Sequence, residues 1–243
     1  MMKIIVSILF AMWSTSVFAG KLTELKFITE SYPPYNYQEN GQLMGMSVDI
    51  LEAATKAAGD PVMRKDVKVQ PWARGYAAAL SGPKVALFAT TRTAERESKF
   101  KWVGPISDTK VVIFSAKDVT VNGAEDLNNY RIGAVRDDIG EQLLKQLGVK
   151  ASAIKLQPKA DLLVKQLGAG RIDMLAYEEN VASYLMRSAN IDKSKFKVVY
   201  VLSESQLYYS LSSDTPDDYV SMLQGGIDSI TSSGVLAEIK SKY

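Results

Sequence analysis

Two hydrophobic periodicities alternate along most of this chain. Short apolar runs of strand length are followed by segments whose apolar residues recur at the spacing of an amphipathic helix. The runs predict strands at 25–30, 67–70, 85–89, 110–114, 131–135, 154–156, 172–176, 197–201 and 207–211. The helical spacing predicts helices at 47–58, 71–80, 139–147, 161–167, 180–186 and from 215 onward. Such alternation is typical of an α/β protein with mostly parallel sheets.

The loop after the first strand is rich in proline and tyrosine. Pro33 and Pro34 remove backbone donors and restrict their neighbours, so this loop is expected to leave the sheet. Tyr32, Tyr35 and Tyr37 surround the rigid proline pair. They could form the aromatic wall of a binding site or pack over the end of the strand, and the pattern does not choose between these two interpretations.

Hydroxyl groups and an arginine follow the strand at 85–89. Thr91 comes just after this apolar run, and Arg96 lies a few residues further on. In open α/β sheets, ligands bind beyond the carboxyl ends of the strands. Because a guanidinium can hold both oxygens of a carboxylate, Thr91 and Arg96 predict a carboxylate site. The alternative is a surface ion pair between Arg96 and Glu95 or Glu97.

The N-terminus has the pattern of a cleavable export signal. A basic start, a short apolar stretch and small residues ending at Ala19 predict a signal peptide over residues 1–19. The apolar stretch is too short to cross a bilayer comfortably. No cysteine follows it, so a lipid anchor on an N-terminal cysteine is not expected.

Composition narrows the class of protein further. Cleavage would leave 243 − 19 = 224 residues, with 28 basic residues (29 less Lys3) against 27 acidic ones, so no basic stripe for a nucleic acid is expected. Cysteine and histidine are both absent. This excludes disulfides, thiol catalysis and zinc sites built on these ligands, and no cofactor is expected. An exported chain without cysteine fits the bacterial periplasm.

Several short motifs occur in an order that is specific when they are taken together. They are Tyr32-Pro33-Pro34-Tyr35 with Gly41 and Gly45, Thr91 with Thr93-Ala94-Glu95-Arg96, Ala169-Gly170-Arg171-Ile172-Asp173, and Ser233-Gly234-Val235-Leu236-Ala237-Glu238-Ile239. Through them the chain resembles the bacterial extracellular solute-binding proteins of family 3, the polar amino-acid type, over nearly all residues after the signal. Pro71-Trp72-Ala73-Arg74 and Lys101-Trp102-Val103-Gly104-Pro105 resemble a Trp-x-Arg branch of that family.

The resemblance implies a two-lobed periplasmic-binding-protein-like (type II) fold with a ligand cleft between the lobes. Lobe 1 would comprise residues 20–105 and 207–243, and lobe 2 would comprise residues 111–201. The hinge crossings would lie at 106–110 and 202–206.

The resemblance also implies ligand-binding residues in lobe 1. Arg96 would hold the ligand's carboxylate, Thr91 would add its hydroxyl and amide, and Ala89 would offer its backbone carbonyl to the ligand's amine. Tyr32 and Trp72 would supply aromatic walls. In lobe 2, Glu178 stands where the family usually has an aspartate that binds the amine.

Further charged residues near the expected cleft have less certain roles. Arg136 would reach the cleft, as the side chain at that position does in relatives. Glu30 is a further candidate acid, with a solvated loop charge as the alternative. Asp137 and Asp138 stand where the family usually offers a Gly-Thr pair to an anion, and two acids there disfavour an anionic group. Asp138, with Glu141 three residues on, is expected to cap its own helix, and Asp137 is left open.

The expected function is capture of a small polar carboxylate-bearing solute in the periplasm by hinge closure, and its delivery to an ABC permease. The chain is expected to act as a monomer and to carry out no chemistry. Two alternatives stay open. One is a dehydratase-like enzyme on the same fold, with Glu178 or Glu30 as general acid. The other is a sensory partner that presents its ligand to the outer domain of a membrane receptor.

Overall fold

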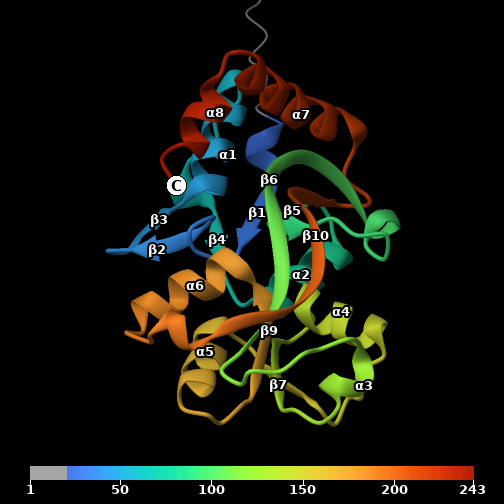
Figure 1. Ribbon diagram of the computed structural model, residues 1–243. Helices are drawn as coiled ribbons and strands as arrows, with labels where there is room; N and C mark the ends of the chain where they lie inside the picture. Colours follow the sequence, from blue (N-terminus) through green and yellow to red (C-terminus); the bar gives the residue numbers. More distant parts are fainter. Residues whose placement is uncertain (1–20) are drawn as a thin grey trace, which may run out of the picture.

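The computed structural model describes residues 21–243, so the predicted signal peptide lies outside the described residues. Two lobes are joined by two long strands, β6 (Phe100–Ser115) and β10 (Lys197–Ser212), which run through both (Figure 1). Lobe 1, at the top of Figure 1, contains β1 (Lys26–Thr29), β2 (Tyr37–Glu39), β3 (Gln42–Met44), α1 (Met46–Ala57), β4 (Lys68–Val69), α2 (Trp72–Ser81), β5 (Val85–Thr91), α7 (Asp217–Ser232) and α8 (Val235–Lys240). Lobe 2 contains α3 (Ala124–Leu127), β7 (Ile132–Val135), α4 (Ile139–Leu147), β8 (Ile154–Gln157), α5 (Ala160–Gly168), β9 (Met174–Glu178) and α6 (Glu179–Ser188).

One hydrogen-bonded strand order links the two lobes, β4-β1-β5-β10-β6-β9-β7-β8. In lobe 1, β1 pairs in parallel with β4 and β5, and in lobe 2, β7 pairs in parallel with β8 and β9. The two long strands pair antiparallel with each other. Helices cover these strands, as the alternating pattern predicts. The predicted α/β, two-lobed fold class is therefore confirmed.

The two long strands differ from what the hydrophobic pattern predicts. It separates 197–201 from 207–211, yet β10 is one strand of 16 residues that follows β6 along its whole length. The polar residues between the two apolar runs stay in the ladder because β6 supplies backbone partners to them. The register shifts at three places along β10, which bends and twists the ribbon that carries the crossings.

Close packing of two helices in lobe 1 depends on one glycine. A Cβ atom on Gly226 of α7 would lie 2.2 Å from the backbone oxygen of Ala54 on α1. Without a side chain at this position the two helices can approach each other, so the late helix covers the early one.

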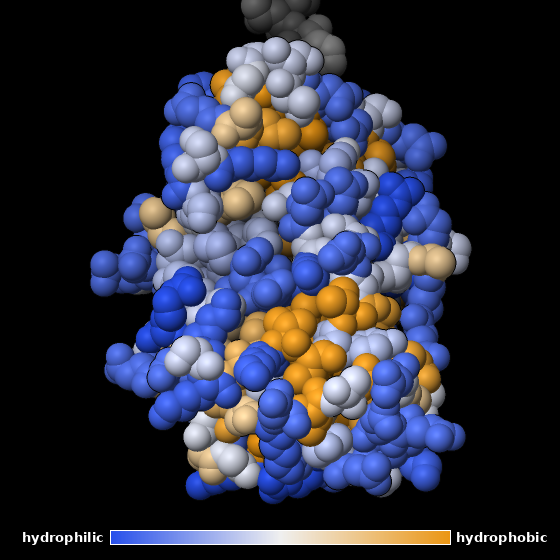
Figure 2. All heavy atoms as spheres, in the orientation of Figure 1, coloured by the Kyte–Doolittle hydropathy of each residue, from blue (hydrophilic) through white to orange (hydrophobic). Residues whose placement is uncertain are grey.

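The outer surface is mostly polar. In the space-filling view, apolar residues reach the surface chiefly over part of lobe 2 (Figure 2). Two exposed valines, Val198 and Val201, lie on β10 where it is an edge strand bonded to β6 on one side. No helix in the described part of the chain is long and apolar enough to cross a membrane.

Candidate ligand site between the lobes

The carboxyl ends of four strands bring polar residues to the space between the lobes. Glu30 directly follows β1, and Thr91 ends β5. From the opposite lobe, Asp138 follows β7 and Glu178 ends β9. All four are buried, although they come from distant parts of the chain. Parallel strands deliver such side chains to one edge of each sheet, where α/β proteins bind ligands.

Arg96 lies at the centre of this buried group. Its side chain is fully buried; Nη1 donates to the backbone oxygen of Thr91 at 3.2 Å, and Nε donates to Oε1 of Gln142 in lobe 2 at 3.0 Å. The remaining nitrogen, Nη2, has no hydrogen-bond partner among residues 21–243. Within the same range, the guanidinium has no carboxylate close enough for a salt bridge. A buried charge without a bonded counter-ion is costly, so the site suits an incoming anion.

Two aromatic rings cover the guanidinium. Its central carbon lies 5.3 Å from the ring centre of Trp72 and 5.1 Å from that of Tyr76. These two residues are four positions apart on α2 and stack on each other at 5.6 Å. Their faces attract the cation while they exclude water from it. Trp72 thus lies between Arg96 and lobe 2 with Tyr76 beside it, and its role as a ligand wall stays a prediction.

The predicted carbonyl of Ala89 lies at a break in strand β5. Thr90 pairs with Tyr208 and Phe88 pairs with Tyr209, so Ala89 is the extra residue of a β-bulge. Its φ angle is 57°, a left-handed conformation that alanine rarely adopts. Bulges re-aim backbone groups next to binding sites, and strained residues of this kind cluster at functional sites.

A second aromatic group lines the other part of the cleft. Tyr32 stacks on Tyr35 at 5.5 Å and meets Tyr177 of lobe 2 edge-on at 5.7 Å. The Tyr177 hydroxyl is buried and has no hydrogen-bond partner within the described chain. Burial raises the pKa of Tyr177, and the nearby carboxyls of Glu30, Asp138 and Glu178 raise it further.

The three carboxyl groups are unusual because each is shielded from water. Burial raises the pKa of Glu178 to about 7, and it raises the pKa of Asp138 to about 6 although the Arg96 guanidinium lowers it. Burial also raises the pKa of Glu30 well above its usual value, and the Asp138 carboxyl adds to this effect. A positive group on a ligand would favour the ionised form of these acids, because an opposite charge lowers a raised carboxyl pKa.

Hydrogen bonds hold the two lobes together at this site. Trp72 Nε1 of lobe 1 donates to the backbone oxygen of Asp137 at 2.8 Å. The Tyr35 hydroxyl donates to Oε1 of Glu178 at 3.3 Å. With the Arg96–Gln142 bond, these contacts make the geometry of the site depend on how the lobes meet.

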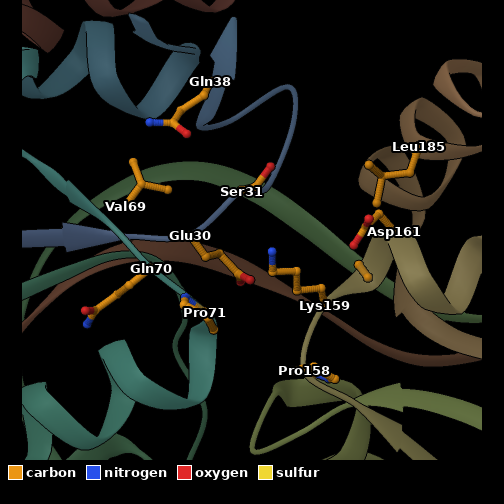
Figure 3. Close-up of a pocket in the computed structure, with 11 residues that line it drawn as sticks. Glu30, Ser31, Gln38, Val69, Gln70, Pro71, Pro158, Lys159, Asp161 and Leu185 are labelled. Atoms are coloured by element: carbon orange, nitrogen blue, oxygen red, sulfur yellow. The ribbon is translucent and has the colours of Figure 1, made fainter. Parts of the chain in front are cut away.

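A cavity adjoins Glu30 on the side of the cleft shown in Figure 3. It has a volume of about 420 Å³ and lies between the lobes. Lobe 1 contributes the wall formed by Glu30, Ser31, Gln38, Val69, Gln70 and Pro71, and lobe 2 contributes Pro158, Lys159, Ala160, Asp161 and Leu185. Among residues 21–243, no group of three or more Asp or Glu side chains is arranged to hold a metal ion.

Asp138 does not have the role that its spacing predicts. The capping interpretation is wrong for this residue: within the described structure its side chain makes no capping hydrogen bond, and Oδ2 is buried without a partner. Glu141 reaches back instead to the backbone nitrogen of Asp137, at 2.6 Å. The Asp138 carboxyl is buried beside charged groups: burial raises its pKa, the Arg96 guanidinium and the Ile139 backbone both lower it, and the carboxyl raises the pKa of Glu30.

Arg136 and Asp137 lie in the turn between β7 and α4. Both side chains are exposed, and Arg136 is not among the buried residues around Arg96.

Tyr76, Gln142 and Tyr177 were not among the residues predicted for the site. The position of Tyr76 four residues after Trp72 could have indicated it, since both lie on one helix face. The sequence around Gln142 gives no such indication, because its hydrogen bond with Arg96 forms only where the two lobes meet.

The fold and this site define a class: two lobes that enclose a small charged ligand between them. A sequence profile of the bacterial extracellular solute-binding proteins, family 3, matches residues 25–243, and the chain belongs to that family. This confirms the resemblance seen in its motifs. The protein is therefore an extracellular-type solute-binding protein.

Individual relatives are distant. The arginine-binding extracellular protein ArtP of Bacillus subtilis (strain 168) is 23% identical over 234 residues, which cover 93% of this chain and 87% of ArtP. The arginine-, lysine-, histidine-binding protein ArtJ of Geobacillus stearothermophilus superposes with a TM-score of 0.75 at 20% identity, over 90% of this chain and 94% of ArtJ. A histidine kinase sensor domain similar to periplasmic binding proteins also reaches 0.75, at 19% identity over 90% and 95% of the two chains. At these identities the solved structures support the fold alone.

Proposed function

We propose that this protein binds a cationic amino acid or a closely similar compound in the periplasm and delivers it to an ABC permease. In this proposal the ligand's carboxylate lies on Arg96, and its amine is held by the carbonyl of Ala89 and the carboxyl of Glu178. Thr91 and the aromatic rings of Tyr32 and Trp72 complete the walls.

One observation carries the proposal: Arg96 is a fully buried guanidinium with a nitrogen that has no partner in the described chain. A planar carboxylate matches this group, because it accepts two parallel hydrogen bonds from the guanidinium fork. Such a contact contributes about 1.5–3 kcal/mol. A micromolar complex needs about 8 kcal/mol, so the amine contacts and ring contacts must act with it.

The excess of acids supports a cationic ligand. Glu30, Asp138 and Glu178 are buried around one arginine, and a second positive charge on the ligand would balance part of their charge. The names of two relatives agree with this class, since ArtP is arginine-binding and ArtJ binds arginine, lysine and histidine.

The mechanism that this geometry supports is hinge closure. Lobe 1 would bind the ligand first, and bending of β6 near 106–110 and of β10 near 202–206 would bring lobe 2 onto it. The ligand favours the closed form because it then contacts both lobes. The closed monomer would dock on the permease. We propose no chemical step, because the cleft offers no cysteine, histidine or paired nucleophile and base.

Replacement of Arg96 by methionine tests the carboxylate assignment. Arginine should raise the thermal unfolding midpoint of the natural protein, because it binds the folded state alone. In Arg96→Met this shift should disappear, with affinity lowered about 10- to 150-fold, since the loss of about 1.5–3 kcal/mol corresponds to that range. Calorimetric titration would measure it.

Arg92→Met is the matched control, because Arg92 is partly exposed and bonded to Glu97 on the surface of lobe 1. Arginine should raise the thermal unfolding midpoint of the Arg92→Met protein as it does for the natural protein. An Arg96→Met protein that still binds arginine with natural affinity would rule out the carboxylate assignment.

A further inference from the structure

The cavity beside Glu30 is distinct from the immediate surroundings of Arg96. Arg96, Trp72 and Tyr76 do not line it, and its walls are instead formed by the loop after β1, strand β2, the segment before α2, and the first turn of α5. At about 420 Å³ it falls in the size range of small-molecule sites. Glu30 is common to both parts of the cleft, because it lines the cavity and its pKa, which burial raises, is lowered by the Arg96 guanidinium.

Glu30 is the residue that indicates a ligand in this cavity. The residue is 8% exposed, and among residues 21–243 no hydrogen bond or ion pair joins its carboxyl group to another group. In Figure 3 its carboxyl group points into the space between the lobes. A carboxyl group buried without a partner is unfavourable, and an ammonium group entering the cavity would satisfy it.

The opposite wall supplies complementary groups. Lys159 extends from lobe 2 toward Glu30, and Asp161 lines the same side of the cavity (Figure 3). Lys159 can donate hydrogen bonds to an acyl oxygen, while Glu30 and Asp161 can accept them from an ammonium group. A neighbouring ammonium and acyl oxygen are the two polar groups of an α-aminoacyl residue, the first residue of a peptide.

We propose that the ligand is longer than one amino acid: a dipeptide or a similar aminoacyl compound that spans both spaces. Its terminal carboxylate would bind Arg96, and its first residue would occupy the Glu30 cavity, with the ammonium on Glu30 and Asp161 and the acyl oxygen on Lys159. This inference rests on the proposed carboxylate site at Arg96, and it narrows the ligand class of the same cleft.

Calorimetric titration with matched ligand pairs tests this inference. Arginine, lysine and glutamine would each be compared with the dipeptide in which alanine precedes the same residue. At least one dipeptide should bind tenfold or more tightly than its free amino acid. If every dipeptide binds more weakly than its free amino acid, the inference is wrong while the proposed function stands. If neither kind of ligand binds, both fail.

Affinity measurements on a variant whose cavity is filled by a larger side chain provide a second test. Gln38 is exposed on β2, so Gln38→Trp should fold normally and occupy the space. It should lower dipeptide affinity tenfold or more and change amino-acid affinity less than twofold. Gln42→Trp, on the paired strand of the same hairpin and outside the cavity, should change neither. Equal losses for both ligand types would show that the cavity is only the solvent-filled mouth of the cleft.

Lys159→Ala tests the acyl contact directly. It should weaken dipeptide binding several-fold and leave amino-acid binding unchanged. Lys165→Ala, on the same helix but away from the cavity, is its control. If both lysine variants behave like the natural protein while Gln38→Trp acts as expected, the cavity binds the first residue by shape and Lys159 has no role.

Discussion

Ala89 shows how one residue can be held in an unfavourable conformation. The bulge in β5 places it at φ 57°, where a Cβ atom approaches the backbone and costs about 1–2 kcal/mol. The neighbouring ladder bonds of β5 to β10 maintain this conformation. This conformation directs the Ala89 carbonyl group out of the ladder, where it can face a ligand.

Replacing Ala89 by glycine should therefore stabilise the protein. Glycine adopts positive φ readily, so the free energy of unfolding should rise by about 1 kcal/mol, measured by urea denaturation. Ala86→Gly on the same strand is the control. Ala86 is fully buried and pairs regularly in the ladder, so its replacement should destabilise the protein. A loss of stability in Ala89→Gly would contradict the strained conformation.

At the scale of elements, helix α2 is the part of lobe 1 that contacts the turn between β7 and α4. Trp72, at its first position, donates to Asp137 in that turn and covers Arg96 with its ring. The same side chain thus covers Arg96 and contacts lobe 2. If Trp72 binds ligand as proposed, closure and binding are coupled through it, since both depend on the position of α2 relative to lobe 2.

Trp72→Phe separates these two roles, because it keeps an aromatic ring and removes the indole donor. Affinity for the ligand should fall about 3- to 10-fold, the worth of one hydrogen bond that contributes about 0.5–1.5 kcal/mol to the closed form. Calorimetry would measure the affinity, and small-angle X-ray scattering would report the closure.

Trp102→Phe serves as the control for this pair. The Trp102 indole donates to Glu97 within lobe 1, so its loss should leave affinity unchanged. Equal effects of the two substitutions would argue against a role of the Trp72 bond in closure.

At the scale of the whole molecule, bringing the lobes together buries acids that would be ionised in water. Burial raises the pKa of Glu178 from its usual 4.5 to about 7, and that of Asp138 to about 6. The folded chain therefore binds more protons than the unfolded chain between about pH 4.5 and pH 7. Stability from these groups is present at the acidic end and is lost as the pH rises through this range.

We expect the free energy of unfolding, without added ligand, to fall between about pH 4.5 and pH 7.5. Glu178 alone accounts for about 3 kcal/mol, since each unit of pKa shift corresponds to about 1.4 kcal/mol. Binding of a cationic ligand should strengthen over the same range, because ionised carboxylates attract it. Chemical denaturation and calorimetry at several pH values would measure both effects.

Glu178→Gln should reduce the slope of both profiles, and its side-chain oxygen can still accept the hydrogen bond from Val181 at the start of α6. Glu179→Gln is the control, because Glu179 is only partly buried and lies 3.8 Å from Lys110. Profiles that Glu178→Gln leaves unchanged would show that Glu178 is ionised throughout this range.

The sequence by itself determined the α/β order of elements and the family, and it predicted residues for the site. Strand and helix periods depend on neighbours within a few positions, so burial patterns of β5 and α2 are visible in the chain. Arg96, Thr91 and Trp72 follow or begin such elements closely, and strand ends in α/β sheets face the ligand. Their placement in the cleft could therefore be predicted.

Only the tertiary structure decided how the two lobes use these residues. Asp138 has the spacing of a helix cap, but burial beside Glu30 and Arg96 makes it part of the cleft. Gln142 reaches Arg96 only because the lobes meet, and β10 stays continuous because β6 pairs with it throughout. Hydrogen-bond partners and the pKa of a buried acid depend on atoms that arrive from distant parts of the chain, and local spacing carries no information about them.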